Sequence, residues 1–359
     1  GFDISTIRPS GLATSNAAKT TDGIAVFNRL QILNFSTSRK IEMFVLEDNT
    51  VVSAHLGKNA NRVFQDVTVP SLPTVQQVRS GNYFYWYTFP LMNYYHTIND
   101  GLGPIARYFE LRERIPDLQF ILNPDARKIG SHPPFVQELL ELFDIPWQYS
   151  DEHSRYECVY FSDTMVQTPD GKRCRPQPGV YSMIERLVAV AQQRYPDVPT
   201  ADSVYLSRRI HANPRYRKDI LGEDNTVKRA IVNEDSVVDA LQQLGYTEVF
   251  GENYTLGEKI SMFSRMQRYI STAGAGVTNL LWRINQPLSV GGVHSPGFPF
   301  PGQNHNRHIV CGSPWMDQCR ILLYDGTVSF VDPTRGAVTY NAPWQIDNIS
   351  QFTEWAKQI

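Results

Sequence analysis

Hydrophobic and polar positions divide the chain into a β-rich opening and a longer stretch of alternating helices and strands. Up to about residue 70 the chain is rich in Thr, Ser and Asn, and short alternating runs such as residues 41–46 predict β-strands. An aromatic run from Tyr83 to Phe89 follows. Helices and strands are then predicted in turn: a helix through 106–111, a strand at 118–122, a helix at 134–143, a strand at 159–161 and a helix at 180–194. This alternation predicts an α/β layer with a largely parallel sheet.

The pattern is sharper in the second half of the chain. Pro196 and Pro199 follow an amphipathic helix, which predicts an interdomain linker at residues 195–200. Strands are expected at 203–206, 247–250, 268–271 and 288–290, separated by helices that begin at Asn233, at a capping box of Thr255 and Glu258, and near Thr278. This β-α-β-α-β-α-β run is typical of a Rossmann-like fold. The predicted domains are therefore residues 1–195 and 200–340, followed by a terminal helix at 344–359.

Composition and charge narrow the class of protein. The chain has 359 residues, 42% of them hydrophobic and 19% charged, as in ordinary globular proteins. Lys and Arg number 34 and Asp and Glu 36, and this net charge of −2 argues against a nucleic-acid partner. No apolar run approaches the roughly 18 residues that span a bilayer. Because the chain opens at Gly1 rather than Met, a preceding membrane anchor or signal stays open.

Cysteine and histidine spacings predict no metal centre. The four cysteines show no C-x-x-C pair, and neither D-x-D nor H-E-x-x-H occurs. Two local disulfides, Cys158 with Cys174 and Cys311 with Cys319, would fit a secretory lumen, and four thiols would fit a cytoplasm. The localisation therefore stays open between the two. Three histidines in the loop that follows residue 290 are expected to be solvated: His294, His305 and His308.

A glycine turn is the strongest candidate for chemistry. The predicted strand at 268–271 leads through Gly274, Ala275 and Gly276 into a helix that carries Asn279. Glycines let a backbone approach a phosphate, and free N–H groups at a helix start favour an anion. A pyrophosphate cradle and a purely structural turn that needs a positive φ are equally good interpretations. The turn lacks the third glycine of the dinucleotide fingerprint, because Asn279 occupies that position.

A basic cluster precedes the turn in the sequence. Arg208 is the second residue after the predicted strand 203–206, and Arg229 stands shortly before Asn233 and Glu234. Guanidinium groups match phosphate oxygens and would stabilise the charge that grows on a departing nucleotide. A solvated charged loop is the structural alternative. Arg208 is the better candidate, because open α/β sheets bind ligands at the carboxyl ends of their strands.

His96 and Asp100 form a candidate acid–base pair. Four residues apart, they would share one helical face, and a carboxylate that orients an imidazole creates a general base near neutral pH. Such a base could take a proton from an acceptor hydroxyl. A helix-interior histidine beside a first-turn aspartate is the simpler structural interpretation.

In this order, the three features resemble glycosyltransferase family 61, whose signature runs N-x-x-H-x-x-x-D, then Ser-Arg after a strand, then Arg-x-x-x-Asn-Glu, then Gly-Ala-Gly with a nearby Asn. Here these are Asn93 with His96 and Asp100; Ser207 with Arg208; Arg229 with Asn233 and Glu234; and Gly274, Ala275 and Gly276 with Asn279. The resemblance spans about residues 80–290. Ala273 is a departure, because the family usually has His at that position.

The resemblance implies a fold and an activity. It implies a GT-B architecture of two Rossmann-like domains that face a cleft, and an inverting transfer with no cofactor and no obligatory metal. The donor would be a nucleotide sugar, such as UDP-xylose, UDP-arabinose or UDP-GlcNAc, and the acceptor a glycan or glycoprotein. His96 and Asp100 would act on the acceptor side. The donor side would comprise Arg208, Arg229, Asn233, Glu234, Gly274, Ala275, Gly276 and Asn279.

Two other functions remain possible on the sequence alone. A nucleotide- or carbohydrate-binding protein without catalysis would fit the same fold, and Ala273 motivates that alternative. A nicotinamide-dependent oxidoreductase would fit the Rossmann-like pattern, although the dinucleotide fingerprint is missing.

Overall fold

The structure of the protein is a computed structural model. It describes residues 24–33, 42–47, 49, 51–56, 62–66, 72–86, 94–124, 132–162, 166–167, 175–176, 178–209, 230–272, 274–296, 318–331 and 342–359. The chain divides into two compact units, Gly1–Ile184 and Glu185–Ile359. The division falls within helix α4 (Pro178–Arg194), ahead of the Pro-containing segment 195–200.

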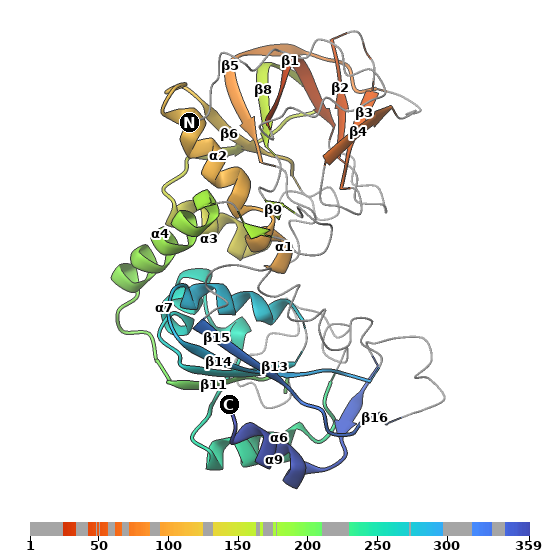
Figure 1. Ribbon diagram of the computed structural model, residues 1–359. Helices are drawn as coiled ribbons and strands as arrows, with labels where there is room; N and C mark the ends of the chain where they lie inside the picture. The colour runs from red at the N-terminus through yellow and green to blue at the C-terminus, as the bar shows by residue number, and fades with distance from the viewer. Residues whose placement is uncertain are drawn as a thin grey trace. The chain divides into compact units, whose positions relative to one another are not determined.

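Unit 1 is built on one eight-stranded mixed sheet with the strand order β4-β3-β2-β1-β8-β5-β6-β7 (Figure 1). The strands are β1 (Ile24–Leu33), β2 (Glu42–Val45), β3 (Val51–Leu56), β4 (Arg62–Asp66), β5 (Gln77–Tyr85), β6 (Gln119–Leu122), β7 (Trp147–Tyr149) and β8 (Ser154–Ser162). Strands β9 (Val166–Gln167) and β10 (Arg175–Pro176) pair separately.

The pairing in unit 1 confirms the parallel sheet predicted for the alternating stretch and joins it to the β-rich opening through antiparallel strands. The run β8-β5-β6-β7 is parallel, whereas β4-β3-β2-β1-β8 is antiparallel throughout. Strands β1 to β4 follow one another through short connections, which can join antiparallel neighbours but are too short for a parallel crossover. The Rossmann-like pattern in this unit is therefore confined to its parallel half.

Aromatic side chains fill both faces of this sheet. Tyr83 and Tyr85 join the core on one face with Phe44 and Phe161, whose ring centroids lie 4.9 Å apart. Phe84 points to the other face, where it contacts Tyr108 of α2 (Leu102–Arg112). Helix α3 (Pro134–Leu142) also buries its apolar side chains in this unit. The buried part of the predicted aromatic run thus builds the core.

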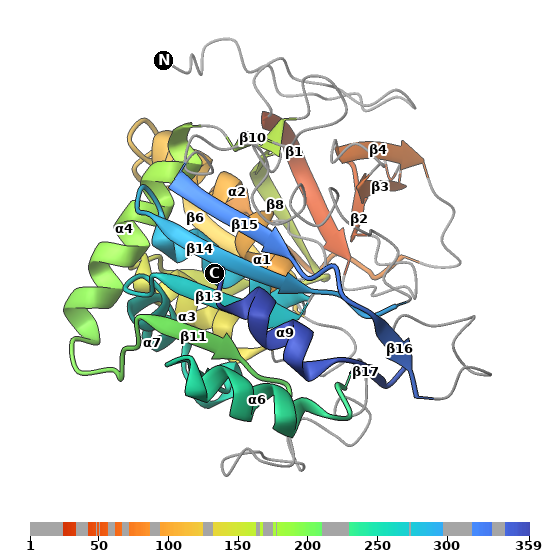
Figure 2. The same cartoon turned by 60° about the horizontal axis from the view of Figure 1, so that its bottom comes forward.

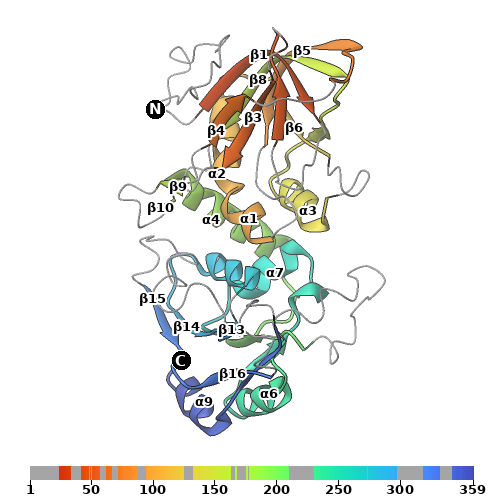
Figure 3. The same ribbon diagram turned by 90° about the vertical axis from the view of Figure 1, so that its right-hand side faces the viewer.

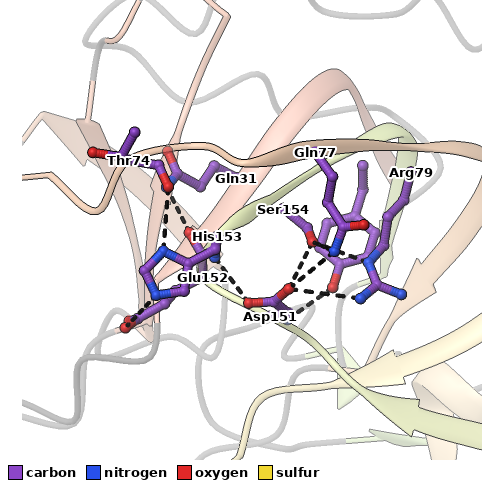
Figure 4. Close-up of polar contacts among 9 residues, drawn as sticks. Gln31, Thr74, Gln77, Arg79, Asp151, Glu152, His153 and Ser154 are labelled. Carbon is purple, nitrogen blue, oxygen red and sulfur yellow. Dashed lines mark hydrogen bonds and ion pairs between the residues drawn. The ribbon is translucent and has the colours of Figure 1, made fainter.

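Polar side chains fasten the amino ends of β5 and β8 to each other. Figure 4 shows Asp151, just before β8, facing Ser154, Gln77 and Arg79. Its carboxylate accepts hydrogen bonds from the Ser154 hydroxyl at 2.8 Å and from the His153 backbone N–H at 2.9 Å. Burial acts to raise the pKa of Asp151, but these hydrogen bonds outweigh it and lower the pKa. The network therefore fixes the amino ends of β5 and β8 relative to each other.

Unit 2 is built on a five-stranded sheet in the order β12-β11-β13-β14-β15. All neighbours are parallel, as Figure 2 shows for the strands from β11 to β15. The strands are β11 (Ser203–Leu206), β12 (Thr247–Val249), β13 (Arg268–Thr272), β14 (Leu288–Val293) and β15 (Cys319–Leu323). Numbered within the unit, this is the 2-1-3-4-5 order of a doubly wound fold. The Rossmann-like prediction is therefore confirmed for the second half of the chain.

Helices cover the two faces of this sheet separately. Figures 1 and 3 show α6 (Glu234–Gln243) and α9 (Ile349–Ala356) on one face and α7 (Leu256–Phe263) on the other. The 3₁₀ helices are η4 (Gly251–Asn253) and η5 (Ala275–Arg283), and the hairpin strands are β16 (Val328–Phe330) and β17 (Trp344–Ile346). The core between the sheet and α6 and α9 contains Tyr205, Ile270, Val293 and Trp355. Tyr205, Ile270 and Val293 come from strands, so they point to one face of the sheet. The residues next to them in sequence point to the other face.

The described part of the chain can be compared with two further predictions, one on membrane-spanning segments and one on disulfides. None of its helices is long and apolar enough to cross a membrane. Cys158 and Cys319 are free thiols, and burial raises the pKa of both, to about 12 for Cys319. Cys174 and Cys311, the other members of the two suggested pairs, lie outside the described residues.

The capping box at the start of α7 gives a test of local stability. The Glu258 carboxylate accepts a hydrogen bond from the Thr255 backbone N–H at 2.8 Å, and the Thr255 hydroxyl accepts one from the Glu258 N–H at 3.3 Å. Thr255→Ala should lower the free energy of unfolding by about 1 kcal/mol. Urea unfolding of the full chain measures this loss. Thr255→Ser keeps the hydroxyl and serves as the control, so equal losses in both variants would contradict the role of the cap.

Candidate functional site

The carboxyl edge of the unit 2 sheet brings predicted residues together. Strands β11 and β13 are neighbours, and the chain leaves β11 toward β12 on one side but continues from β13 toward β14 on the other. Open α/β sheets bind ligands outside the carboxyl ends of strands at such a switch point. Ser207 and Arg208 follow β11 directly, and Gly274 stands two residues beyond the end of β13. The topology therefore places the basic residue and the glycine turn on neighbouring strands at one edge.

The glycine turn has the backbone that its sequence predicts. Gly274 has φ of +154° and ψ of −173°, a combination that is essentially restricted to glycine. The helix expected near Thr278 begins three residues earlier, at Ala275, and it is a 3₁₀ helix. The first N–H groups of η5 have no earlier turn of the helix to donate to. The positive φ of Gly274 therefore fits both interpretations of the turn, as a pyrophosphate cradle and as a purely structural turn.

Gly276 packs closely against the last residue of β11. A Cβ atom on Gly276 would lie 2.3 Å from Cδ2 of Leu206, the last residue of β11. The Gly276 carbonyl accepts a hydrogen bond from the Tyr269 hydroxyl at 3.0 Å. Burial raises the pKa of Tyr269 strongly, although hydrogen bonds with the Ser271 and Asn279 side chains partly offset this. Asn279, which is itself buried, thus supports the turn from within the unit.

A buried carboxylate organises the end of β11. Glu234, in the first turn of α6, is only 2% exposed. Its Oε1 atom accepts hydrogen bonds from the Tyr205 hydroxyl at 2.7 Å, the Arg208 backbone N–H at 2.8 Å and the Ser207 hydroxyl at 3.1 Å. Burial raises the pKa of Glu234, although these three donors act in the opposite direction. Glu234 therefore holds the backbone of Arg208 in place.

The two arginines after β11 have different surroundings. Arg209 forms a two-pronged ion pair with Glu248, through Nε at 2.9 Å and Nη2 at 2.6 Å, and contacts Asp235 at 2.6 Å. These partners raise the pKa of Arg209 further above its ordinary value, and they bind its guanidinium to β12 and α6. Arg208 is partly exposed at the edge itself. Arg229, the other predicted cation, lies outside the described residues.

Asn233 stands at the N-cap position of α6, as predicted, but its side chain does not cap the helix. Its amide nitrogen donates to the Ile346 carbonyl at 2.8 Å, and its amide oxygen accepts from the Ile346 N–H at 3.2 Å. Asn233 therefore ties the start of α6 to β17, which sequence spacing alone could not reveal.

In unit 1 the candidate acid–base residues follow β5. Helix α1 (Tyr94–Asn99) carries His96, whose side chain lies outside the described part of the structure. Asp100 lies in the turn between α1 and α2, so the expectation that one helix carries both residues is wrong: α1 ends one residue before Asp100. Trp86, just after β5, donates from Nε1 to the Gly101 carbonyl at 3.2 Å. This bond fastens the turn that carries Asp100 to the carboxyl end of β5.

His294 departs from the expectation that it is solvated. It follows β14 directly, it is partly buried, and both its ring nitrogens are shielded from solvent. Burial lowers its pKa to about 4, so the imidazole is neutral near neutral pH. Its position directly after an apolar strand was the sequence signal that could have identified it. His305 and His308 lie outside the described residues.

The described part of the chain contains no group of three or more His, Cys, Asp or Glu side chains placed to hold a metal ion.

The raised pKa of Glu234 predicts a pH dependence of stability. Because the folded-state pKa lies above the ordinary value of 4.5, the stabilisation is complete below that pH and is lost as pH rises through the folded-state pKa. Glu234→Gln cannot ionise but keeps an accepting oxygen. Urea unfolding at a series of pH values from about 4 to 7 should therefore show wild-type stability falling relative to Glu234→Gln. If the difference in unfolding free energy between wild type and Glu234→Gln stayed constant with rising pH, or grew in favour of the wild type, the raised pKa of Glu234 would be contradicted.

The contact between Gly276 and Leu206 predicts non-additive substitutions. Gly276→Ala should cost about 1–3 kcal/mol, because its methyl group overlaps the Leu206 side chain. Leu206→Ala removes the overlapping atoms at the cost of a cavity. The double variant should therefore lose less stability in urea than the sum of the single losses. Strict additivity would show that Leu206 does not limit residue size at position 276.

Comparison with known proteins identifies the family. No curated protein matches the chain. The family model for Glycosyltransferase 61 matches residues 94–290, which include α1, the end of β11, Glu234 and the glycine turn. This family match favours sugar transfer over the oxidoreductase considered above. Because the match covers more than half of the chain, the protein belongs to glycosyltransferase family 61 and is a glycosyltransferase.

Proposed function

We propose that the protein transfers a sugar from a UDP-sugar to a hydroxyl group of a glycan or glycoprotein, with inversion at the anomeric carbon. The observation that carries this proposal is the carboxyl edge of unit 2, where Arg208 and the turn at Gly274 follow neighbouring strands at a switch point. Family membership supports a nucleotide sugar as donor and a glycan as acceptor in general.

The donor diphosphate is proposed to bind over the glycine turn. The N–H groups that open η5 and the guanidinium of Arg208 are donors suited to phosphate oxygens. Negative charge grows on the diphosphate as the bond to the sugar breaks, so donors already in position lower the barrier. Arg229 is proposed as a second cation, and we expect this charge stabilisation to require no divalent metal.

Three residues predicted to bind the donor are proposed to position the groups that bind it, without contacting the donor themselves. Glu234 fixes the backbone of Arg208, Asn233 fixes the start of α6, and Asn279 contacts the tyrosine that holds the turn. Preorganised donors need such a second layer, because small displacements weaken hydrogen bonds to a transition state.

The acceptor is proposed to be activated from unit 1. In an inverting transfer the acceptor oxygen attacks the anomeric carbon while a base removes its proton, and the nucleoside diphosphate leaves from the opposite side. His96 is the proposed base and Asp100 its orienting carboxylate, because an imidazole near neutral pH can accept this proton. Both residues follow the carboxyl end of β5, which is flanked by parallel strands on both sides. A GT-B arrangement, in which this edge and that of unit 2 face one cleft, is part of the proposal.

Ligand binding tests the proposed donor site, and turnover tests the residues proposed to act on the acceptor. UDP at about 100 times its dissociation constant should stabilise the protein by about 2.7 kcal/mol in a thermal-shift assay, with and without EDTA. Arg208→Ala should abolish the shift. Arg265→Ala is the matched control, because Arg265 follows α7 and precedes the amino end of β13.

Turnover is then measured with UDP-xylose, UDP-arabinose and UDP-GlcNAc, and the anomeric configuration of the product is determined by NMR. His96→Ala and Asp100→Ala should keep the UDP shift and lose transfer by a factor of roughly 100 or more. His153→Ala, at the amino end of β8, should change neither. Full turnover in both His96→Ala and Asp100→Ala would overturn the assignment of the base. No UDP shift in the wild type, or loss of activity in EDTA, would overturn the donor proposal.

A further inference from the structure

The two peptide units that flank Arg208 are both held by hydrogen bonds within unit 2. The Arg208 N–H donates to Oε1 of Glu234 at 2.8 Å, and the Arg209 N–H donates to the Ser207 hydroxyl oxygen at 3.1 Å. The Ser207 hydroxyl in turn donates to Glu234 at 3.1 Å. Because peptide units are planar, fixing the unit on each side of a residue limits its φ and ψ. The direction in which the Arg208 side chain leaves the backbone is therefore restricted by these neighbours.

The side chain of Arg209 anchors the second of these peptide units. Its Nε and Nη2 atoms donate to the two carboxylate oxygens of Glu248 at 2.9 and 2.6 Å, and its Nη1 contacts Asp235 at 2.6 Å. Only 17% of the Arg209 side chain and 10% of the Glu248 side chain are exposed. A planar guanidinium that binds a carboxylate through two parallel hydrogen bonds has a defined orientation. Residue 209 is thus fixed to β12 by its side chain and to Ser207 by its backbone.

These contacts give two consecutive arginines different chemical roles. The Arg209 guanidinium is already bound to two carboxylates, so a phosphate group would have to compete with Glu248 for it. Removing one partner of a largely buried ion pair leaves the other charge uncompensated, which is costly. Arg208, whose backbone is held by the same network, is therefore the better phosphate ligand of the two, and Arg209 is its support.

We propose that Arg209 is a positioning residue: through its ion pair with Glu248 it holds Arg208 in the orientation that binds the donor diphosphate, and it does not contact the donor itself. This inference rests on the proposed function and deepens it. Its prediction for Glu248 is opposite to that of simple electrostatics. Removing a negative charge near an anion site would by charge alone strengthen the binding of UDP, whereas losing the anchor of Arg209 weakens it.

Calorimetric titration of the full chain with UDP tests the sign of this effect. Glu248→Gln and Arg209→Gln should each raise the dissociation constant of UDP roughly 10-fold, as expected for one misaligned hydrogen bond to a charged group. The double variant should bind no more weakly than the weaker single variant, because both changes remove the same anchor. Arg268→Gln is the matched control and should bind UDP as the wild type does. Arg268 also contacts β11, through Nε and the Ser203 hydroxyl at 2.7 Å, but at the amino end of the sheet.

The same titrations separate this inference from the proposed function. If the wild type does not bind UDP, the proposed function fails and the inference fails with it. If the wild type binds UDP and Arg208→Ala does not, but Glu248→Gln binds as tightly as the wild type or more tightly, only the inference is overturned. Additive losses in the double variant would also overturn it, since Arg209 would then act independently of Glu248. An equal loss in Arg268→Gln would do the same, because the effect would not be specific to the Arg208 side of the sheet.

A measurement on the wild type covers the case in which the glutamine variants do not fold. The Nε–H signals of ¹⁵N-arginine-labelled protein are recorded with and without saturating UDP, and Arg208→Lys and Arg209→Lys, which keep the charge, assign the two signals. The Arg208 signal should shift, whereas the Arg209 signal should keep its position because its Nε stays bound to Glu248. In Glu248→Gln the Arg208 shift should be smaller, which a role in stability alone would not cause. A shift of the Arg209 signal as large as that of Arg208 would overturn the proposal.

Discussion

The carboxylate of Glu234 is the interaction on which the edge of unit 2 depends. One oxygen of a 2%-exposed side chain accepts hydrogen bonds from a tyrosine hydroxyl, a serine hydroxyl and the backbone N–H of Arg208. Burying a carboxyl group is costly, and the rise in its pKa reflects that cost. The Oε1 atom of Glu234 joins the first turn of α6 to the end of β11. The position of the Arg208 backbone is therefore a consequence of core packing rather than of a mobile loop.

The turn after the neighbouring strand β13 is also held by contacts within unit 2. Leu206, the last residue of β11, fills the space beside Gly276, and Tyr269 from β13 holds the carbonyl of that glycine. The turn after β13 is thus shaped by side chains from two adjacent strands. A side chain at position 276 would therefore displace Leu206 even before any ligand is considered.

Elements whose signals are local were predicted closely. Strand β11 occupies the predicted residues 203–206, and the capping box of Thr255 and Glu258 opens α7 as expected. Helix α4 ends at Arg194, as its periodicity predicted. The antiparallel pairing of β1 to β4 was not predicted, because pairing joins residues distant in sequence and period-two patterns do not specify the partner. The separation of His96 and Asp100 by the end of α1 was also missed, since four-residue spacing says nothing of where a helix stops.

The sequence by itself determined the order of the elements, the doubly wound character of the second half and the motif that belongs to glycosyltransferase family 61. These follow from periodicity, capping residues and the spacing of a few polar positions, all of which are local. Only the tertiary structure decided how the polar side chains are used. Glu234, Asn233 and Arg209 look alike as polar neighbours of a motif, yet each is bound to a distant strand or hairpin. The burial that makes His294 a neutral imidazole depends likewise on what packs around the end of β14, and no pattern along the chain records that environment.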